Sequence, residues 1–375
     1  MKIIFWSDGF WPNIGGVEVL ASSFIPVMQE RGHEFCIITS HLGQGLPDQS
    51  TYRGSTLHRF HFHRALDSRN LKEIKIIADR IKEIKRAFGP DLIHINFSGI
   101  SPFFHQLSRF PNEPPTVTTI HALPAALSSG QAPMMKQTLM NSRWVTAVSQ
   151  AMLNEALLIA PQISPKSSVI YNGLKKPPLP GTELDFNNPR LLCLGRLSNE
   201  KGFDIALRAL TQIVRRFPDV HLVVAGDGPE RGELETLASL LGLGSHVSFV
   251  GWVPPEKRYE LINQSCLLIV PSRWKEPFCL VALEGALMGR PVVASRTGAL
   301  PEVVVENETG IFFENENPAS LADAVISLLE SPSLATAMGL RGRERANRKF
   351  TWDRYIDSFE MLFTQLAHER RNVPD

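Results

Sequence analysis

The sequence lacks the features that mark several classes of protein. Its four cysteines, Cys36, Cys193, Cys266 and Cys279, form no C-x2-C pair, so neither a disulfide framework nor a zinc site built on cysteine is expected. No run of about 18 apolar residues is present that would span a bilayer. The N-terminal apolar run meets Asp8 before a secretory signal could form, which favours a cytoplasmic protein.

An excess of charge of one sign is also missing. Lys and Arg number 39 against 38 Asp and Glu, and a net charge of +1 makes a nucleic-acid partner unexpected. There is no Asp-x-Asp pair to hold a divalent cation, so we expect no metal and no other cofactor. What is present is 43% hydrophobic residues against 21% charged ones, which is typical of globular chains. A length of 375 residues predicts two domains.

Short apolar runs alternate with amphipathic stretches along both halves, which predicts two doubly wound parallel sheets of the α/β class. The expected strands are 2–6, 34–39, 91–96, 116–121, 144–149, then 190–195, 221–226, 247–251, 266–271, 290–295 and 310–313. The expected helices are 17–31, 71–88, 133–142, then 202–217, 230–241, 255–264, 278–289 and 318–330.

The proline-rich segment 175–181 predicts a linker between the two halves. The domains are therefore expected at 1–174 and 182–350, with a late helix at about 352–369 packing back on the first.

Two cations follow the first strand of the second half. Arg196 and Lys201 precede Gly202 and a predicted helix. The planar guanidinium of Arg196, the ammonium of Lys201 and the N-terminus of this helix are therefore expected at the same edge of the sheet. Ligands of such sheets bind at the carboxyl ends of the strands. This pattern predicts a diphosphate site, whereas cations on a solvated loop are the alternative.

Glu276 and Glu284 flank the start of a predicted helix that Phe278 begins. Their spacing predicts separate roles, with Glu276 holding hydroxyls of a sugar and Glu284 a ribose. The alternative for Glu276 is a carboxylate that only interacts with the helix dipole, and the alternative for Glu284 is an acidic residue on the helix surface. The backbone N–H groups that would meet a phosphate are those of Cys279, Leu280 and Val281.

Other candidates are weaker. Gly15 and Gly16 allow close approach of a ligand to the backbone, and most such pairs are only turns. His121 ends a predicted strand, where a structural histidine is the alternative to a catalytic one. Trp252 either borders a nucleobase or is an ordinary half-buried aromatic residue.

A family resemblance rests on segments that occur in a fixed order along nearly the whole chain. These segments are WPNIGGVEVL, DLIHIN, TTIHA, VTAVS, IYNG, LGRLSNEKGFDIAL, VVAGDGPER, VSFVGWV and EPFCLVALEGALMGRPVVAS. Together they resemble the retaining nucleotide-sugar glycosyltransferases of family 4. The resemblance implies a GT-B fold, in which two Rossmann-like domains face across a cleft, with the donor in the second domain and the acceptor mainly on the first.

The resemblance also implies roles for the candidates. Arg196 and Lys201 become diphosphate ligands, Glu276 the contact to the transferred sugar, and Glu284 the ribose contact. It makes Gly16 a backbone contact and His121 a residue at the reacting sugar. It implies retention at the anomeric carbon without a protein nucleophile and without a metal. Cys279 departs from the glycine that is common in the family's E-P-F-G segment, and its side chain would lie beside the phosphates.

The expected activity is transfer of a sugar from a nucleoside diphosphate to a hydroxyl, in polysaccharide, glycolipid or glycoside synthesis. A UDP-sugar is the first candidate donor and GDP-mannose the second; the acceptor is a sugar, a lipid-linked molecule or a small molecule. A nucleotide-sugar epimerase and a non-catalytic sugar-nucleotide binding protein are the alternatives.

Two further patterns carry less. His58, His61 and His63 suggest a metal because residues two apart point to one face of a strand, but no carboxylate or cysteine joins them. Residues 72–86 form a basic amphipathic helix, which is either a solvated core helix or a peripheral membrane contact.

Overall fold

The computed structural model describes residues 1–13, 15–43, 45–123 and 132–371. The chain divides into two compact units, and each is described here by itself. The first unit comprises Met1–Tyr171 and the chain from Tyr355 onward, and the second comprises Asn172–Arg354.

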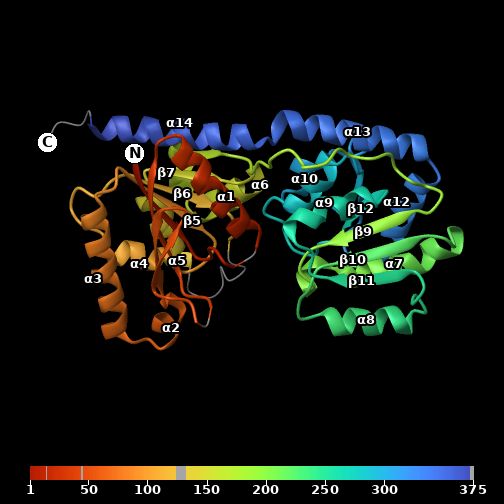
Figure 1. The fold of residues 1–375 in the computed structure, drawn as a ribbon, viewed down its shortest axis with the longest axis horizontal. Helices are drawn as coiled ribbons and strands as arrows, with labels where there is room; N and C mark the ends of the chain where they lie inside the picture. The colour runs from red at the N-terminus through yellow and green to blue at the C-terminus, as the bar shows by residue number, and fades with distance from the viewer. Residues whose placement is uncertain (14, 44, 124–131, 372–375) are drawn as a thin grey trace. The chain divides into compact units, whose positions relative to one another are not determined.

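The first unit is built on an eight-stranded sheet in the order β3-β4-β2-β1-β5-β6-β7-β8 (Figure 1). All its pairings are parallel except that of β3 with β4. The strands are β1 (Lys2–Ser7), β2 (Glu34–Ser40), β3 (Gln49–Tyr52), β4 (Ser55–Phe60), β5 (Leu92–Phe97), β6 (Thr116–Ile120), β7 (Trp144–Ala147) and β8 (Ser167–Val169). The helices are α1 (Gly16–Glu30), α2 (Phe62–Asp67), α3 (Leu71–Phe88), α4 (Pro102–Leu107), α5 (Ala132–Asn141), α6 (Gln150–Ile159), the 3₁₀ helix η1 (Pro161–Lys166) and α14 (Trp352–Arg371).

The central strands of this sheet are buried on both faces. Every residue of β5 and β6 is buried, including the polar residues of LIHINF and TVTTI, because strands in the middle of a parallel sheet are covered on both faces. Helix α3 shows the other pattern, because Ile77, Ile81 and Ile84 on one face enter the core while most of its charged residues are exposed.

The second unit is an all-parallel sheet in the order β11-β10-β9-β12-β13-β14. Its strands are β9 (Arg190–Leu194), β10 (His221–Ala225), β11 (Val247–Gly251), β12 (Leu267–Val270), β13 (Val292–Ser295) and β14 (Gly310–Phe313). Its helices are the 3₁₀ helix η2 (Asn199–Lys201), α7 (Phe203–Arg216), α8 (Arg231–Leu240), α9 (Pro255–Asn263), α10 (Leu280–Leu287), α11 (Leu300–Val303), α12 (Pro318–Leu329) and α13 (Pro332–Lys349). Strand order reverses between β9 and β12, so the loops after these two strands flank the switch point.

The boundary between the units lies a few residues from the one expected at 174. Leu174 N–H donates to Phe350 O, and Trp352 N–H donates to Leu174 O, so the chain has already joined the second unit there. The proline-rich segment also lies along this unit, because Asn263 Nδ2 donates to Pro180 O at 2.8 Å.

The C-terminal helix α14 is a structural part of the first unit. Phe359 and Phe363 pack edge-to-face against Phe24 of α1, with ring centres 5.5 and 6.4 Å away, and the ring centres of both lie 5.1 Å from that of His94 of β5. The last helix of the chain therefore contributes aromatic side chains to the core of the first unit.

Candidate active site

The turn after β9 is pressed against the turn after β10. A Cβ at Gly226 would lie 1.7 Å from Gly195 O, and one at Gly228 would lie 2.3 Å from Leu197 O. The two turns are also hydrogen-bonded, since Leu197 N–H donates to Asp227 O at 3.0 Å. The GDGPERG segment therefore supports the loop that carries Arg196 and Lys201, and only glycine fits at these crossings.

A second close approach positions Lys201. Gly202, with φ +65°, adopts a left-handed conformation, and a Cβ there would lie 2.1 Å from Pro271 O, at the end of β12. The short 3₁₀ turn that ends at Lys201 is thereby held against the loop that follows β12. This brings a cation from one side of the switch point to a carboxylate on the other side.

That carboxylate is Glu276. Its Oε1 accepts from Lys201 Nζ at 2.7 Å and from Ser272 Oγ at 2.6 Å, and its side chain is 5% exposed. Its backbone is held as well, because Ala299 N–H donates to Glu276 O at 2.8 Å. A Cβ at Gly298 would lie 2.3 Å from that same carbonyl oxygen, so glycine is required beside it.

The ammonium of Lys201 is confined by an aromatic ring as well as by charge. Lys201 Nζ lies 5.3 Å from the ring centre of Trp274. Burial is the strongest single influence and acts to lower the pKa of Lys201, but the charges of Glu276 and other neighbours and the hydrogen bond to Glu276 together outweigh burial, so the pKa is raised and the group stays cationic.

A bidentate ion pair fixes the loop after β12 to the first turn of α7. Arg273 donates from both terminal nitrogens to the two carboxylate oxygens of Asp204, each at 2.7 Å. Arg273 N–H also donates to Glu200 O. Paired, parallel hydrogen bonds of this kind restrict geometry, so the loop holds Glu276 and Lys201 in register.

Arg196 and Trp252 are placed at the surface of the second unit. Arg196 follows β9 and is exposed, and no ion pair ties its guanidinium to a residue in the described ranges. Trp252 follows β11 and is 53% exposed. Arg196 is thus a cation with its donors turned to solvent, next to a lysine that is already paired.

Glu284 forms a separate ion pair. Its Oε1 accepts from Arg258 Nη1 at 2.6 Å, while its buried Oε2 has no partner among the described residues. Burial raises the pKa of Glu284, and the charge of Arg258 only partly offsets this. The two glutamates therefore contact different cations.

Helix α10 begins later than the sequence pattern predicts. Cys279 has φ +74° and ψ +78°, which is left-handed, so the helix starts at Leu280 rather than at Phe278. The ring of Phe278 is buried and packs against Phe350 at 5.5 Å, so only its backbone can face a ligand. Burial raises the pKa of the Cys279 thiol to about 12.

In the first unit, three candidates lie at the carboxyl edge of its sheet. Gly15 is the N-cap of α1 and Gly16 its first residue. His121 follows β6 directly, and its buried Nε2 has no partner within the described residues. Burial lowers the pKa of His121 to about 4, which keeps the ring neutral at pH 7.

Asp8, after β1, shares this edge. Its Oδ1 accepts from Ser101 N–H at 2.9 Å. Its buried Oδ2 has no partner in the part of the chain that the structure describes, and burial raises its pKa.

Comparisons with known proteins agree with this architecture. The model for Glycosyltransferase Family 4 matches residues 14–175, and that for Glycosyl transferases group 1 matches residues 181–345. A glycogen synthase from Mycobacterium tuberculosis is 30% identical over 287 residues, which cover 73% of this chain and 69% of the relative. This chain is a family 4 glycosyltransferase.

Solved structures share the fold of this glycosyltransferase. Sucrose-phosphate synthase from Thermosynechococcus elongatus matches with a TM-score of 0.81 at 22% identity, covering 98% of this chain and 100% of that one. Anabaena HepE, solved in complex with UDP, matches with a TM-score of 0.77 at 20% identity, covering 97% and 100%. The predicted GT-B fold is therefore confirmed.

One prediction about the glycosyltransferase was wrong. His61 and His63 are not strand residues like His58, because β4 ends at Phe60, His61 precedes α2 and His63 lies within that helix. No described helix is long and apolar enough to cross a membrane.

Sequence reasoning missed several residues that shape the site of this glycosyltransferase. They are Ser272, Arg273, Asp204, Gly298 and Arg258. Only the glycine carries a signal, because a glycine just after a strand at a sheet edge indicates close approach of backbone. The other four depend on partners that are 4, 26 or 69 positions away, and no spacing rule pairs them.

Proposed function

We propose that this glycosyltransferase is a retaining enzyme that moves a sugar from a nucleoside diphosphate to an acceptor hydroxyl. The observation that carries the proposal is the buried Lys201–Glu276 pair at the switch point, beside the exposed guanidinium of Arg196. A UDP-sugar is the first candidate donor and GDP-mannose the second. The UDP bound to the structurally similar HepE supports the first choice.

The diphosphate is assigned to the two cations. Arg196 offers a planar fork of donors to phosphate oxygens, and Lys201 adds a charge that its aromatic and carboxylate neighbours hold in place. Backbone N–H groups of Cys279 and Leu280, at the start of α10, supply further donors. Negative charge grows on the diphosphate as it leaves, so these contacts strengthen in the transition state.

Glu276 is assigned to the hydroxyls of the transferred sugar. Its Oε1 already takes two short hydrogen bonds, and a carboxylate tied to a lysine in this way is a poor nucleophile. Retention without a protein nucleophile follows if substitution occurs on one face. The bond from the anomeric carbon to the phosphate oxygen breaks, the bond to the acceptor oxygen forms, and the acceptor's proton passes to the leaving phosphate.

Glu284 is assigned to a ribose. Its unpartnered buried Oε2 is an acceptor for a hydroxyl, and Arg258 holds the carboxylate in one orientation. Trp252, exposed after β11, is a candidate neighbour of the base.

In the first unit, we assign the acceptor side to the edge that carries Gly15, Gly16 and His121. A separate prediction is that helix α3, through residues 72–86, contacts an anionic membrane. Leu71 and Ile76 of α3 are 80% and 59% exposed.

The test compares nucleotide binding and turnover in three variants. Arg196→Met and Lys201→Met are each expected to lower release of nucleoside diphosphate from the donor by about 10²-fold, roughly 3 kcal/mol. Titration calorimetry with UDP and with GDP identifies the base. Arg215→Met, which removes an exposed arginine of α7, is the control and should leave both readouts unchanged.

The Arg196→Met variant gives the clearer result of the two. Removing Lys201 leaves the carboxylate of Glu276 buried without its cation, and this alone is expected to destabilise that variant. Wild-type binding and turnover in folded Arg196→Met would therefore refute the diphosphate assignment.

A further inference from the structure

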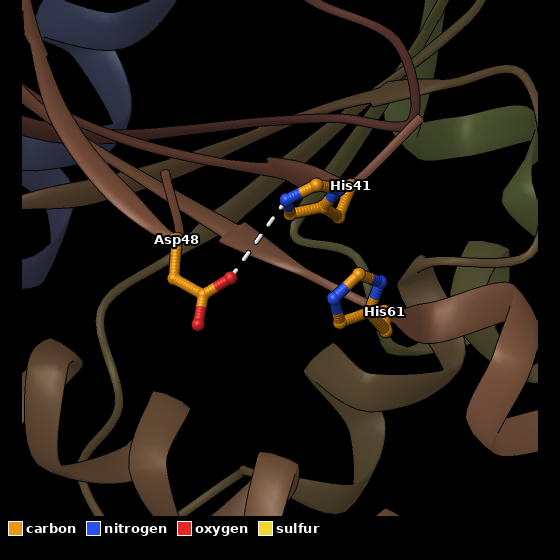
Figure 2. Close-up of side chains that lie close together, drawn as sticks. All are labelled: His41, Asp48 and His61. Carbon is orange, nitrogen blue, oxygen red and sulfur yellow. Dashed lines mark ion pairs between the residues drawn. The ribbon is translucent and has the colours of Figure 1, made fainter. Parts of the chain in front are cut away.

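A cluster of three side chains in the first unit stands apart from the assigned residues. His41, Asp48 and His61 offer ligand atoms that all lie within 4.8 Å of one another. Figure 2 shows the carboxylate of Asp48 turned toward the two imidazole rings.

Strand pairing brings the two histidines together. Parallel strands β2 and β4 pair Ser40 with Phe60, so His41 and His61 are the next residues along each strand. His41 N–H donates to Phe60 O at 2.8 Å, which extends the ladder by one bond. The two rings are stacked with their centres 4.2 Å apart.

Backbone pairing also fixes the carboxylate's position. Asp48 immediately precedes β3, which runs antiparallel to β4, and Arg59 N–H donates to Asp48 O at 2.7 Å. The buried guanidinium of Arg59 donates to Pro47 O and Ser50 Oγ, on either side of Asp48. Three ligand-type residues are thus anchored by secondary structure, and not by flexible loops alone.

The distances suit co-ligands better than direct partners. Asp48 Oδ1 lies 3.8 Å from His41 Nε2, which is too long for a hydrogen bond. Two ligands at about 2.1 Å from a tetrahedral zinc are roughly 3.4 Å apart. The Asp48 side chain is 81% exposed, so a small rotation of its carboxylate closes the remaining gap.

We propose that His41, Asp48 and His61 bind a divalent transition-metal ion. Two imidazoles and one carboxylate suit Zn²⁺ or Co²⁺, whereas Mg²⁺ and Ca²⁺ prefer oxygen ligands. His41 Nε2 also lies 2.8 Å from Leu46 O, so binding the ion needs the tautomer of His41 with its proton on Nδ1, and the contact to Leu46 O is given up. The bound ion ties the connection between β2 and β3 to the start of α2.

The test measures metal binding directly and does not use transferase activity. The full chain, without a histidine tag and stripped with EDTA, is titrated with ZnCl₂ by calorimetry and with CoCl₂ by visible absorption. One Zn²⁺ per chain is expected, with tetrahedral Co²⁺ bands and no Mg²⁺ binding. His61→Ala and Asp48→Asn should each weaken Zn²⁺ binding at least ten-fold.

His63→Ala is the matched control, because His63 is exposed on α2 two residues beyond His61 and is not in the cluster. It should bind Zn²⁺ as the wild type does. His61 makes no side-chain capping bond to α2, so its replacement removes no contact that the helix needs. Equal Zn²⁺ affinity in His61→Ala and His63→Ala, or no stoichiometric Zn²⁺ binding to the wild type, overturns the proposal.

Discussion

At the scale of single residues, Cys279 is held in a conformation that disfavours it. Its φ of +74° lies in the left-handed region, where a Cβ approaches the backbone and costs about 1–2 kcal/mol. Glycine does not have this cost. The cysteine therefore departs from the family's glycine at a position where backbone geometry, and not only space for a ligand, favours glycine.

Cys279→Gly is expected to stabilise the second unit by about 1 kcal/mol, because the strain is relieved while some packing of the thiol is lost. Urea unfolding followed by hydrogen exchange in peptides of this unit measures the change. Cys279→Ala keeps a Cβ and should show no such gain. If Cys279→Ala stabilised the unit as much as Cys279→Gly, the thiol of Cys279, and not its backbone conformation, would be the cause of the lower stability.

The candidate residues that the sequence singled out are those whose chemistry is visible without partners. Arg196, Lys201 and Glu276 are charged residues after strands at a switch point, and of these the structure brings Lys201 and Glu276 into contact. The Arg273–Asp204 pair was not predictable, because it depends on how two loops fold against each other.

At the scale of elements, helix α3 was predictable from its sequence and helix α13 was not. Helix α3 was expected at 71–88 and is found at Leu71–Phe88, since its isoleucines repeat at helical spacing. Helix α13 was missed because its buried face is largely small: Ala335, Met338, Gly339, Gly342 and Ala346. A Cβ at Gly339 would lie 2.0 Å from Gly289 O, so close backbone packing replaces large side chains.

Helix α14 offers a test of how the last element stabilises the first unit. Phe359 is fully buried against Phe24 and His94, and Phe359→Ala is expected to lower the free energy of unfolding of this unit by about 3–5 kcal/mol. Met361→Ala, on the same helix and 73% exposed, should change it by less than about 0.5 kcal/mol. Denaturant unfolding with hydrogen exchange in α1 and β5 reads out both, and similar losses would show that α14 is not part of the core.

At the scale of the whole molecule, the two units differ in their buried histidines. His94, His105 and His121 lie in the core of the first unit. Burial lowers the pKa of His94 to about 3 and that of His121 to about 4, and it lowers the pKa of His105 well below its usual value. The second unit holds His221 and His246, which are only partly buried. The units should therefore respond differently to mild acid.

The first unit is expected to lose stability before the second as pH falls from 7 to 5. A histidine whose pKa is lower in the folded state binds more protons when unfolded, so its stabilising contribution is complete above about pH 6.5 and falls below it. Between pH 7 and 5, His94 and His121 should each remove about 2 kcal/mol. Hydrogen exchange at both pH values, peptide by peptide, follows the two units separately. His94→Gln should reduce the loss of stability between pH 7 and 5 by the contribution of His94. Loss of protection in the second unit before the first would contradict the prediction.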